Sequence, residues 1–332
     1  MASTPSQAAP APRLGWIGLG SMGLAMALNL QRHLLKTSAP SLVFFNRTAS
    51  RGKALGELGG VAAASVADLI AEADVAFLSL SDDAALTQTL DALLQDAVRN
   101  LAGKIVVDTS TVSASCSAAA QARLAARGMR FVAAPVFGAS PVAAEGRLLW
   151  VVAGPDDAVE KIEPYIVGVM GRGVIRLGED VTKASMLKTT GNFLTAGMME
   201  LVAEAHVLAE KTSLPAPVLE SLLEQQYGPL AHSISRRLTS GAYVPTRGSA
   251  PWSDLKLALK DVGLGVDAAE RAGARLEVGE VVMRHLRKAE EYGEAQGRRL
   301  DSAALYGAVR TEAGLEFENW AVRERDGGAA SK

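Results

Sequence analysis

Two polar side chains stand in an otherwise apolar stretch near the middle of the chain, and their types suit proton transfer. Lys188 lies among leucines, methionines and alanines within residues 181–211, and Asn192 follows it by four residues. If the stretch is helical, both side chains project from one face. A lysine in apolar surroundings is costly unless it is paired or used. Desolvation lowers the pKa of such an ammonium group, so it can exchange a proton near neutral pH and stabilise charge on a substrate oxygen.

The surrounding sequence predicts one long helix. Residues 181–211 contain no proline, and about thirty residues rising about 1.5 Å each would span about 45 Å, enough to cross a domain boundary. An apolar stripe recurs at helical spacing, formed by Leu187, Leu194, Met198, Leu201, Ala205 and Leu208. Other faces also carry apolar side chains: Met186, Phe193 and Met199. We therefore expect the first half of this helix to be buried.

A glycine-rich turn near the start of the chain has the spacing of a dinucleotide site. An apolar strand over residues 14–17 is followed directly by Gly18, Leu19, Gly20, Ser21, Met22 and Gly23. In such a turn Gly18 allows the tight bend, Gly20 lets the backbone approach the pyrophosphate, and Gly23 lets helix and strand pack closely. The N-terminus of the helix that follows would face the phosphates. We predict that these six residues bind a dinucleotide cofactor.

The next strand, expected over residues 42–45, ends in Asn46, Arg47 and Thr48. An acidic residue at this position usually bonds the ribose 2′-hydroxyl, and none is present. Arg47 can instead grip a 2′-phosphate, with Asn46 and Thr48 as neutral donors. The alternative is that Arg47 is a solvated loop residue. We predict NADP(H) as the cofactor.

The alternation of strands and helices continues and predicts a doubly wound sheet. Further strands are expected over residues 73–79, 105–108, 129–133 and 148–153. The last of these would close the sheet. Because the carboxyl ends of strands line the cofactor crevice, Leu80 and Ser81 are predicted to contact the cofactor. Ser110 or Thr111 is expected to cap the helix after the strand at 105–108, and a helix N-terminus also attracts a substrate carboxylate.

The second half shows no alternating strands and is predicted to be all-α. Helices are expected over residues 216–226, 229–239, 254–272, 278–292 and 303–310. The loop over residues 240–251 carries Tyr243 and Arg247 and leads to Trp252. These residue types suit a segment that closes over a ligand.

Other titratable side chains suggest little further chemistry. Lys260 and Asp261 are adjacent on a predicted helix, so we expect each to have a separate partner. Glu200 and Glu204 share one helix face and are expected to form a solvated or subunit-facing polar strip. Of the four histidines, His33 is expected after the first helix and His206 near the end of the long helix, whereas His232 and His285 are expected to be isolated on later helices. No spacing typical of metal ligands appears, so we predict no metal site.

Composition bounds the possible classes of protein. The chain has 332 residues, 48% hydrophobic and 21% charged, with a net charge of -2. These values favour neither disorder nor a nucleic-acid partner. No run approaches about eighteen apolar residues, so we expect no membrane span. Cys116 is the only cysteine, which excludes an internal disulfide and fits a reducing, cytoplasmic location.

The patterns divide the chain into four parts. We expect a disordered lead over residues 1–12, a nucleotide-binding domain over 13–180, the long helix with an all-α domain over 181–325, and a loose tail over 326–332. The lead is rich in alanine, serine and proline and lacks the apolar core of a signal peptide.

Taken together, several motifs resemble the β-hydroxyacid dehydrogenases. The resemblance is carried by residues 16–23 and 26–30 around the glycine turn, Asp-Thr-Ser-Thr at 108–111, Ala-Pro-Val at 134–136, Lys188 with Asn192, and Lys260 with Asp261. That family includes 3-hydroxyisobutyrate dehydrogenases and glyoxylate/succinic semialdehyde reductases and is related to 6-phosphogluconate dehydrogenase. The resemblance implies an α/β fold with a Rossmann-type NADP-binding domain, a long interdomain helix and an all-α C-terminal domain. It also implies a homodimer or homotetramer in which the helical domains pair.

The resemblance implies roles for single residues. Lys188 matches the family's catalytic lysine, which exchanges a proton with the substrate oxygen, and Asn192 matches the asparagine that orients this oxygen. Lys260 matches the lysine near the nicotinamide and the substrate carboxylate, and Asp261 matches the acid beside it, so Lys260 is expected to contact the cofactor and Asp261 the substrate. Surface pairing is the alternative for these two. Ser110 matches a serine near the substrate end of the cofactor.

The expected substrate loop departs from the family pattern. The family's loop reads Asp-Ala-Pro-Val-Ser-Gly-Gly, whereas residues 133–139 read Ala-Ala-Pro-Val-Phe-Gly-Ala. Substrate contacts are therefore expected from Phe137, Gly138 and Ala139, and also from Trp252. Phe137 removes a hydroxyl donor and adds apolar bulk. This favours an aldehyde or ketone with an apolar portion, or a cyclic imine, over a small 3-hydroxy acid.

Three functions follow, in decreasing order of support. The first is an NADP(H)-dependent oxidoreductase that acts on a hydroxy acid, semialdehyde or related carbonyl compound, with Lys188 as general acid/base. The second is an imine reductase or reductive aminase, although such enzymes typically carry aspartate, tyrosine or an apolar residue in place of this lysine. The third is a non-catalytic NADP(H)-binding scaffold or sensor, which the presence of Lys188, Asn192 and Lys260 disfavours.

Overall fold

A computed structural model describes residues 11–95 and 100–327. The chain divides after Lys188 into two compact units, here called the α/β unit and the helical unit. The long helix α8 (Val181–Lys211) has its first turns in one unit and the rest in the other. Most of the predicted lead lies outside the described residues, and residues 11 and 12 have no regular structure.

The α/β unit contains a six-stranded parallel sheet in the order β3-β2-β1-β4-β5-β6. The strands are β1 (Leu14–Ile17), β2 (Val43–Phe45), β3 (Val61–Ala62), β4 (Val75–Leu78), β5 (Ile105–Asp108) and β6 (Arg130–Ala133). Chain order reverses between β1 and β4, which places the ligand crevice of such a sheet outside the carboxyl ends of these strands. The predicted doubly wound sheet is confirmed. The edge strand β3 was not predicted, because it has two residues and both are exposed.

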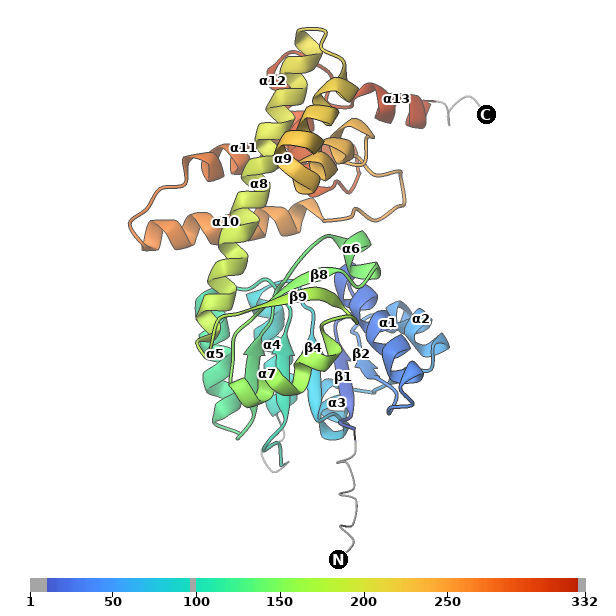
Figure 1. Cartoon of the computed structure of the whole chain (residues 1–332), viewed down its shortest axis with the longest axis vertical. Helices are drawn as coiled ribbons and strands as arrows, with labels where there is room; N and C mark the ends of the chain where they lie inside the picture. Colours follow the sequence, from blue (N-terminus) through green and yellow to red (C-terminus); the bar gives the residue numbers. More distant parts are fainter. Residues whose placement is uncertain (1–10, 96–99, 328–332) are drawn as a thin grey trace, which may run out of the picture. The chain divides into compact units, whose positions relative to one another are not determined.

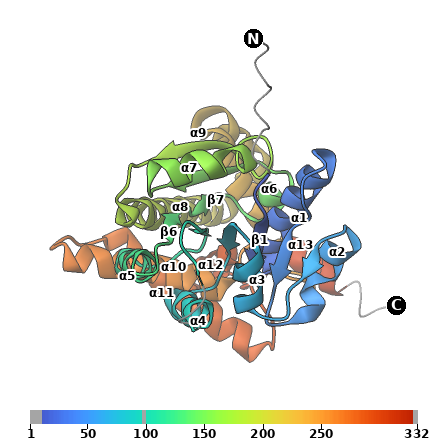
Figure 2. The same ribbon diagram turned by 90° about the horizontal axis from the view of Figure 1, so that it is seen from below.

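Helices cover both faces of this sheet (Figures 1 and 2). They are α1 (Ser21–Lys36), α2 (Lys53–Glu57), α3 (Val66–Glu72), α4 (Asp83–Leu94), α5 (Ala114–Ala125), α6 (Ser140–Ala144) and α7 (Asp156–Ile162), with short 3-10 turns η1 (Ala49–Gly52) and η2 (Glu163–Tyr165). Alternate strand residues enter different cores: Trp16 packs with α1, and Ile17 packs with α3, α4 and α5. This is the pattern of strands buried on both faces, which read as continuous apolar runs.

A second sheet corrects one expectation. It has three strands, β7 (Val136–Phe137), β8 (Leu148–Val152) and β9 (Gly171–Arg176), with β8 in the middle. The prediction that residues 148–153 close the first sheet is therefore wrong. An isolated bridge between Ala133 and Ala153 joins the end of β6 to the residue after β8. The strands β7 and β9 escaped prediction because one is two residues long and the other, Gly-Arg-Gly-Val-Ile-Arg, is half polar.

The helical unit is all-α, as predicted. Beyond α8 it contains α9 (Ala216–Thr239), α10 (Leu255–Arg271), α11 (Glu277–Ala295), η3 (Ser302–Ala304), α12 (Leu305–Glu312) and α13 (Trp320–Gly327). Helix α9 combines two predicted helices around a kink at Gly228. Gly228 has a φ of 81° and directly precedes Pro229. Helix α13 was not predicted. It includes Asp326 and Gly327, which were expected in a loose tail, and the rest of that tail lies outside the described residues.

The buried face of α8 in the helical unit differs from the predicted stripe. Met199, Val202 and Ala203 are buried in the core of this unit. Leu194, Leu201 and Leu208 are instead 61%, 65% and 65% exposed. The prediction that the first half of this helix is buried is thus wrong for Leu194. Leu201 and Leu208, farther along the same stripe, are exposed as well, because the helix presents apolar side chains on two faces and a single chain covers one of them.

Tyr243 is part of this core and not of a ligand loop. It is fully buried, its hydroxyl donates to the carbonyl of Phe317 (2.9 Å), and it accepts from the amide of Asn319 (2.7 Å). Burial raises the pKa of this phenol. The expectation that Tyr243 closes over a ligand is therefore wrong. The neighbouring Arg247 is exposed and donates weakly to the carbonyl of Gln296 (3.5 Å).

Candidate functional site

The glycine turn between β1 and α1 leaves room on one side only. Gly18 has a φ of 95°, and a Cβ there would lie 2.2 Å from the carbonyl oxygen of Ser79. A Cβ on Gly23 would lie 2.1 Å from the carbonyl oxygen of Gly18. A Cβ on Gly20, by contrast, would meet no described atom within 4 Å. Only glycine fits at positions 18 and 23, whereas Gly20 faces open space.

This open space suits the pyrophosphate of a dinucleotide. Gly20 is the N-cap residue of α1, and no described side chain caps this helix. The first amides of α1, from Ser21, Met22 and Gly23, therefore have no i−4 carbonyl within the helix and face an anion-binding position. The predicted residues of the turn thus fit the group they were assigned to.

Side chains at the end of β2 brace the turn. The amide oxygen of Asn46 accepts from the backbone amide of Leu19 (2.8 Å), and its nitrogen donates to the carbonyl of Thr48 (2.8 Å). Asn46 therefore fixes the distance between the turn and the β2 end and keeps one N–H for a ligand. Arg47 and Thr48 are exposed. The guanidinium of Arg47 has no polar partner within residues 11–95 and 100–327, so it can turn toward an anion.

A second brace joins the carboxyl ends of β4 and β5. The buried hydroxyl of Ser110 donates to Asp108 (2.5 Å) and accepts from the backbone amide of Leu80 (2.8 Å). Ser110 thus positions the segment of Leu80 and Ser81. The expectation that Ser110 or Thr111 caps α5 is wrong: Ser113 caps it, accepting from the amide of Cys116 (3.1 Å).

Lys188 is almost completely buried and lies against an aromatic ring. Its side chain is 9% exposed, and its ammonium nitrogen lies 4.5 Å from the centroid of the Phe137 ring. The ring face attracts a cation, so it restricts the position of the ammonium group. Gly138 follows with a φ of 129°, and Ala139 is the N-cap residue of α6. The α/β unit thus places Lys188 against Phe137, the residue that stands where the family's loop has a serine.

Asn192 belongs to a polar cluster of the helical unit. Its side-chain nitrogen donates to Asp261 (2.8 Å), and the other oxygen of Asp261 lies 3.0 Å from the ammonium of Lys260. The expectation that Lys260 and Asp261 avoid each other is wrong, because the long lysine side chain bends back to its neighbour. Asp261 does have a separate partner, as expected, because it also accepts a hydrogen bond from Asn192.

A buried charge cluster in the helical unit was not predicted from the sequence. Glu200 is 2% exposed and bonds the ring of His285 (2.6 Å), whose other nitrogen lies 3.2 Å from Glu312. The expected solvated strip at Glu200 and the expected isolation of His285 are both wrong. His206 is also paired, with Ser235 (2.7 Å). A Glu at helical spacing carries no signal of burial, since its partner His285 lies 85 positions away in the sequence.

Comparisons with known proteins cover most of the chain. A family model described as the NAD binding domain of 6-phosphogluconate dehydrogenase matches residues 13–178, and one described as NAD-binding of NADP-dependent 3-hydroxyisobutyrate dehydrogenase matches residues 182–309. The NADH-dependent oxidoreductase ucdB of Aspergillus ustus is 33% identical over 89% of this chain and 98% of its own length. The chain belongs to the β-hydroxyacid dehydrogenase family.

Other members of this family support the same class. Glyoxylate/succinic semialdehyde reductase 1 of Arabidopsis thaliana is 28% identical over 90% of this chain and 98% of its own length. A crystal structure of 3-hydroxyisobutyrate dehydrogenase from Salmonella typhimurium has the same fold, with a TM-score of 0.74, 22% identity, and coverage of 89% of this chain and 98% of that one. This β-hydroxyacid dehydrogenase is an NAD(P)-dependent oxidoreductase of the 3-hydroxyisobutyrate dehydrogenase type.

Within the described residues, no group of three or more histidine, cysteine, aspartate or glutamate side chains could hold a metal ion. The same part of the chain contains no helix that is long and apolar enough to span a membrane. The α/β unit therefore carries the glycine turn with its two braces and Lys188 on Phe137, and the helical unit separately carries the cluster of Asn192, Lys260 and Asp261.

Proposed function

We propose that the protein transfers hydride between NADP(H) and a hydroxy acid, semialdehyde or related carbonyl compound, with Lys188 as the general acid/base. The observation that carries this proposal is a nearly buried ammonium group held 4.5 Å above an aromatic ring. A structural lysine rarely lies so deep without a use. The bound cofactor supplies or accepts the hydride. Lys188 gives its proton to the carbonyl oxygen as the alcohol forms, and removes it in the reverse direction.

Other side chains would each carry part of this task. Phe137 excludes water from one side of the ammonium group and limits its rotation, which raises the fraction of time that Nζ faces the substrate oxygen. Asn192, whose side chain is held by Asp261, would orient the substrate oxygen. Ser110, Gly138, Ala139, Trp252 and Lys260 remain predicted substrate or cofactor contacts.

The role of Lys188 is tested by Lys188→Ala with Lys183→Ala as control, because Lys183 is exposed on the same helix. We expect Lys188→Ala to lower kcat by roughly 10²- to 10⁴-fold and to leave cofactor affinity unchanged. Lys183→Ala should keep wild-type turnover. Unchanged turnover in Lys188→Ala would show that this lysine is not the general acid/base. Tight NADPH binding without turnover of any carbonyl, alcohol or imine by the wild type would favour the scaffold function instead.

The preference for NADP(H) is the second part of the proposal. Arg47 supports it, since an exposed guanidinium follows β2 where an acid would select NAD. The relative from Aspergillus ustus is named NADH-dependent, so the preference must be measured. We expect kcat/KM for NADPH to exceed that for NADH by at least about tenfold. Arg47→Ala should remove this preference. Lys36→Ala, at the far end of α1, is the control. Equal use of both cofactors by the wild type would refute the NADP(H) assignment.

The apolar ring of Phe137 supports a substrate with an apolar portion. A panel of short semialdehydes, glyoxylate, bulkier ketones and cyclic imines tests this by the oxidation of NADPH. We expect the bulkier ketones to be preferred, and Phe137→Ser to shift the preference toward glyoxylate. A stronger activity on cyclic imines than on any carbonyl would favour the imine reductase alternative. A preference for glyoxylate in the wild type would contradict the role given to Phe137.

We also propose that two copies of the chain associate through α8. Leu194, Leu201 and Leu208 recur every seven residues, which gives one exposed apolar strip on this helix. Such a strip is more typical of a helix that packs on a second copy than of a monomer surface. Light scattering should show a dimer or tetramer, and Leu201→Glu should shift it toward monomer. Leu35→Glu, an exposed leucine on α1, is the control. A monomeric wild type would refute this proposal.

A further inference from the structure

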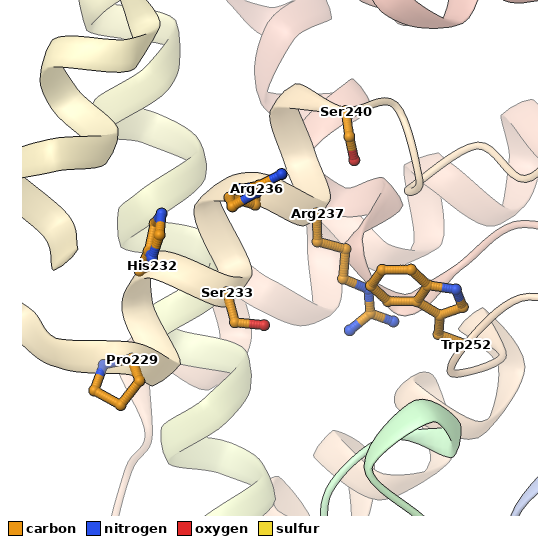
Figure 3. Close-up of a pocket in the computed structure, with 7 residues that line it drawn as sticks. All are labelled: Pro229, His232, Ser233, Arg236, Arg237, Ser240 and Trp252. Carbon is orange, nitrogen blue, oxygen red and sulfur yellow. The ribbon is translucent and has the colours of Figure 1, made fainter. Parts of the chain in front are cut away.

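A pocket lies wholly within the helical unit, between the second half of α9 and the segment that precedes α10 (Figure 3). It has a volume of about 350 Å³. Its walls are Pro229, His232, Ser233, Arg236, Arg237, Ser240 and Trp252. The six residues from α9 and its C-cap follow the three- and four-residue spacing of one helix face. The lining contains two arginines, a histidine and two hydroxyls, and no carboxylate.

One wall of the pocket is fixed before any ligand binds. Arg237 is 11% exposed, pairs with the buried carboxylate of Asp301, and places its guanidinium carbon 5.7 Å from the centroid of the Trp252 ring. Asp301 also accepts from the backbone amide of Ser253 (3.0 Å), which holds the residue after Trp252 in place. The indole ring is 45% exposed. It therefore offers a flat aromatic surface that need not be ordered when a ligand binds.

The wall along α9 differs from the fixed wall at Trp252, because it carries a charged group and hydroxyl groups without partners among the described residues. Arg236 is exposed, and its guanidinium makes no hydrogen bond or ion pair within residues 11–95 and 100–327. The same holds for the hydroxyls of Ser233 and Ser240. The pairing of Arg237 with Asp301 cancels one charge, and the ring of His232 lies 3.6 Å from Glu224. Arg236 therefore carries the uncompensated positive charge of the pocket.

We propose that this pocket binds the carboxylate of a flat, unsaturated organic acid. Arg236 would bond the carboxylate through its planar pair of N–H groups, with the two serine hydroxyls as further donors. The unsaturated body would stack on Trp252. This site shares Trp252 with the predicted substrate contacts, but its charge comes from Arg236, which has no role in the proposed hydride transfer. It goes beyond that function because it needs neither the cofactor nor Lys188. Its binding is therefore measurable on the full chain without turnover.

Three probes separate the two parts of this recognition in a ligand-observed NMR titration. Benzoate has both the charge and the flat ring, benzamide keeps only the ring, and cyclohexanecarboxylate keeps only the charge. We expect benzoate to bind at least about tenfold more tightly than benzamide, as a charge-assisted hydrogen bond allows. It should also bind several-fold more tightly than cyclohexanecarboxylate.

Two variants assign the preferences to single residues. Arg236→Gln should lower benzoate affinity to that of benzamide, and Arg287→Gln, an exposed arginine on α11, should leave it unchanged. Trp252→Leu should remove the preference for benzoate over cyclohexanecarboxylate and leave the affinity of the latter as it was. Thermal unfolding checks that each variant is folded. Absence of benzoate binding, equal affinity for benzamide, or an unchanged affinity in Arg236→Gln would each overturn the proposal. None of these outcomes bears on the role of Lys188.

Discussion

In the α/β unit the groups that would meet a cofactor are mainly backbone atoms, whereas in the helical unit the polar groups are side chains from helices far apart in the sequence. The turn after β1 offers amides of α1, and Asn46 and Ser110 use their side chains to hold backbone segments. The helical unit instead buries Glu200 with His285 and joins Asn192 to Asp261. Backbone sites demand glycine at fixed positions, and side-chain sites demand only that helices pack in one way.

This difference sets how each unit tolerates change. A backbone site fails when a Cβ enters a space that only hydrogen can fill, and the cost is steric. A buried polar cluster fails when one partner is removed, and the cost is an unpaired polar group. The first kind of failure should abolish cofactor binding at once, whereas the second should act through stability and pH. Substitutions in both units, in order of decreasing effect, test this contrast.

Gly23→Ala should have the largest effect. Its Cβ would lie 2.1 Å from the carbonyl oxygen of Gly18, so the turn must shift, at a cost of about 3 kcal/mol of folding free energy. We expect cofactor affinity to fall by more than about 100-fold. Chemical denaturation and fluorescence titration with NADPH measure the two effects.

Gly20→Ala is the matched variant that sharpens this test. Its Cβ enters space free of described atoms and its φ of -69° suits alanine, so stability should stay close to that of the wild type. Cofactor affinity should still fall, because the methyl group occupies the position expected for the pyrophosphate. If Gly20→Ala bound NADPH normally, the cofactor would not approach the turn as described.

The same contrast explains what the sequence predicted and what it did not. The strand β5, the glycine turn and the burial of Lys188 follow from local patterns, since apolar runs and fixed glycine spacings act over a few residues. The placement of β8 in a second sheet depends on its pairing with β9, which is twenty or so residues distant and half polar. The burial of Glu200 depends on packing against α11 and α12. The pattern of residues along one segment does not show which distant segments will pack against it.

Glu200→Gln should have the next largest effect and should depend on pH. The hydrogen bond that His285 donates to Glu200 raises the pKa of His285, and Glu312 adds to it. Arg284 and Lys288 on α11 also face this cluster, each paired with Glu312. A raised pKa in the folded state stabilises the protein fully below the unfolded pKa of about 6.5, and this gain is lost as the pH rises through the folded value.

We therefore expect Glu200→Gln to lower the free energy of unfolding by about 2 kcal/mol at pH 6, as for a lost charged hydrogen bond. The loss should be smaller at pH 9. Urea denaturation at both pH values measures it. Glu204→Gln, on the exposed side of α8 one turn on, should have no effect at either pH. An equal loss at both pH values would show that the pair does not couple protonation to folding.

Asp261→Ala should have a moderate effect on activity and little on stability. It removes the acceptor that holds Asn192 (2.8 Å) and leaves the amide free to rotate. We expect kcat to fall by about tenfold, the loss of one oriented hydrogen bond. The double variant with Asn192→Ala should be no slower than Asn192→Ala alone if Asp261 acts through Asn192. Multiplied losses in the double variant would show instead that Asp261 contacts the substrate directly, as predicted from sequence.

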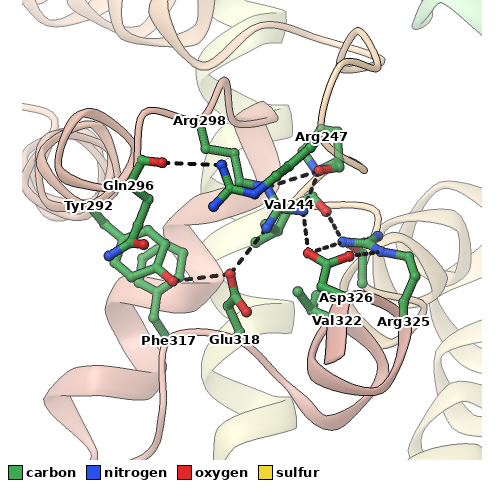
Figure 4. Close-up of polar contacts among 12 residues, drawn as sticks. Val244, Arg247, Tyr292, Gln296, Arg298, Phe317, Glu318, Val322, Arg325 and Asp326 are labelled. Carbon is green, nitrogen blue, oxygen red and sulfur yellow. Dashed lines mark hydrogen bonds and ion pairs between the residues drawn. The ribbon is translucent and has the colours of Figure 1, made fainter. Parts of the chain in front are cut away.

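Asp326→Asn should have the smallest effect, because this carboxylate is partly exposed. It accepts from Arg325 (2.7 Å) on α13 and pairs with Arg298 (2.6 Å), as Figure 4 shows. Arg298 is 5% exposed and also donates to the carbonyl of Pro245, so it ties α13 to the loop before α10. The bonds from Arg325 and Arg298 lower the pKa of Asp326.

A lowered pKa means that Asp326 stabilises the fold above the unfolded pKa of about 3.9 and loses this contribution as the pH falls through the folded value. We expect Asp326→Asn to cost about 1 kcal/mol at pH 7 and to open α13 to hydrogen exchange. Glu324→Gln, exposed on the same helix, should change neither. The difference between the wild type and Asp326→Asn should shrink below pH 4. If Asp326→Asn lowered the free energy of unfolding as much as Glu200→Gln does, the exposure of a polar cluster would not determine how much it stabilises the helical unit. Helix α13 would then be part of the core of this unit.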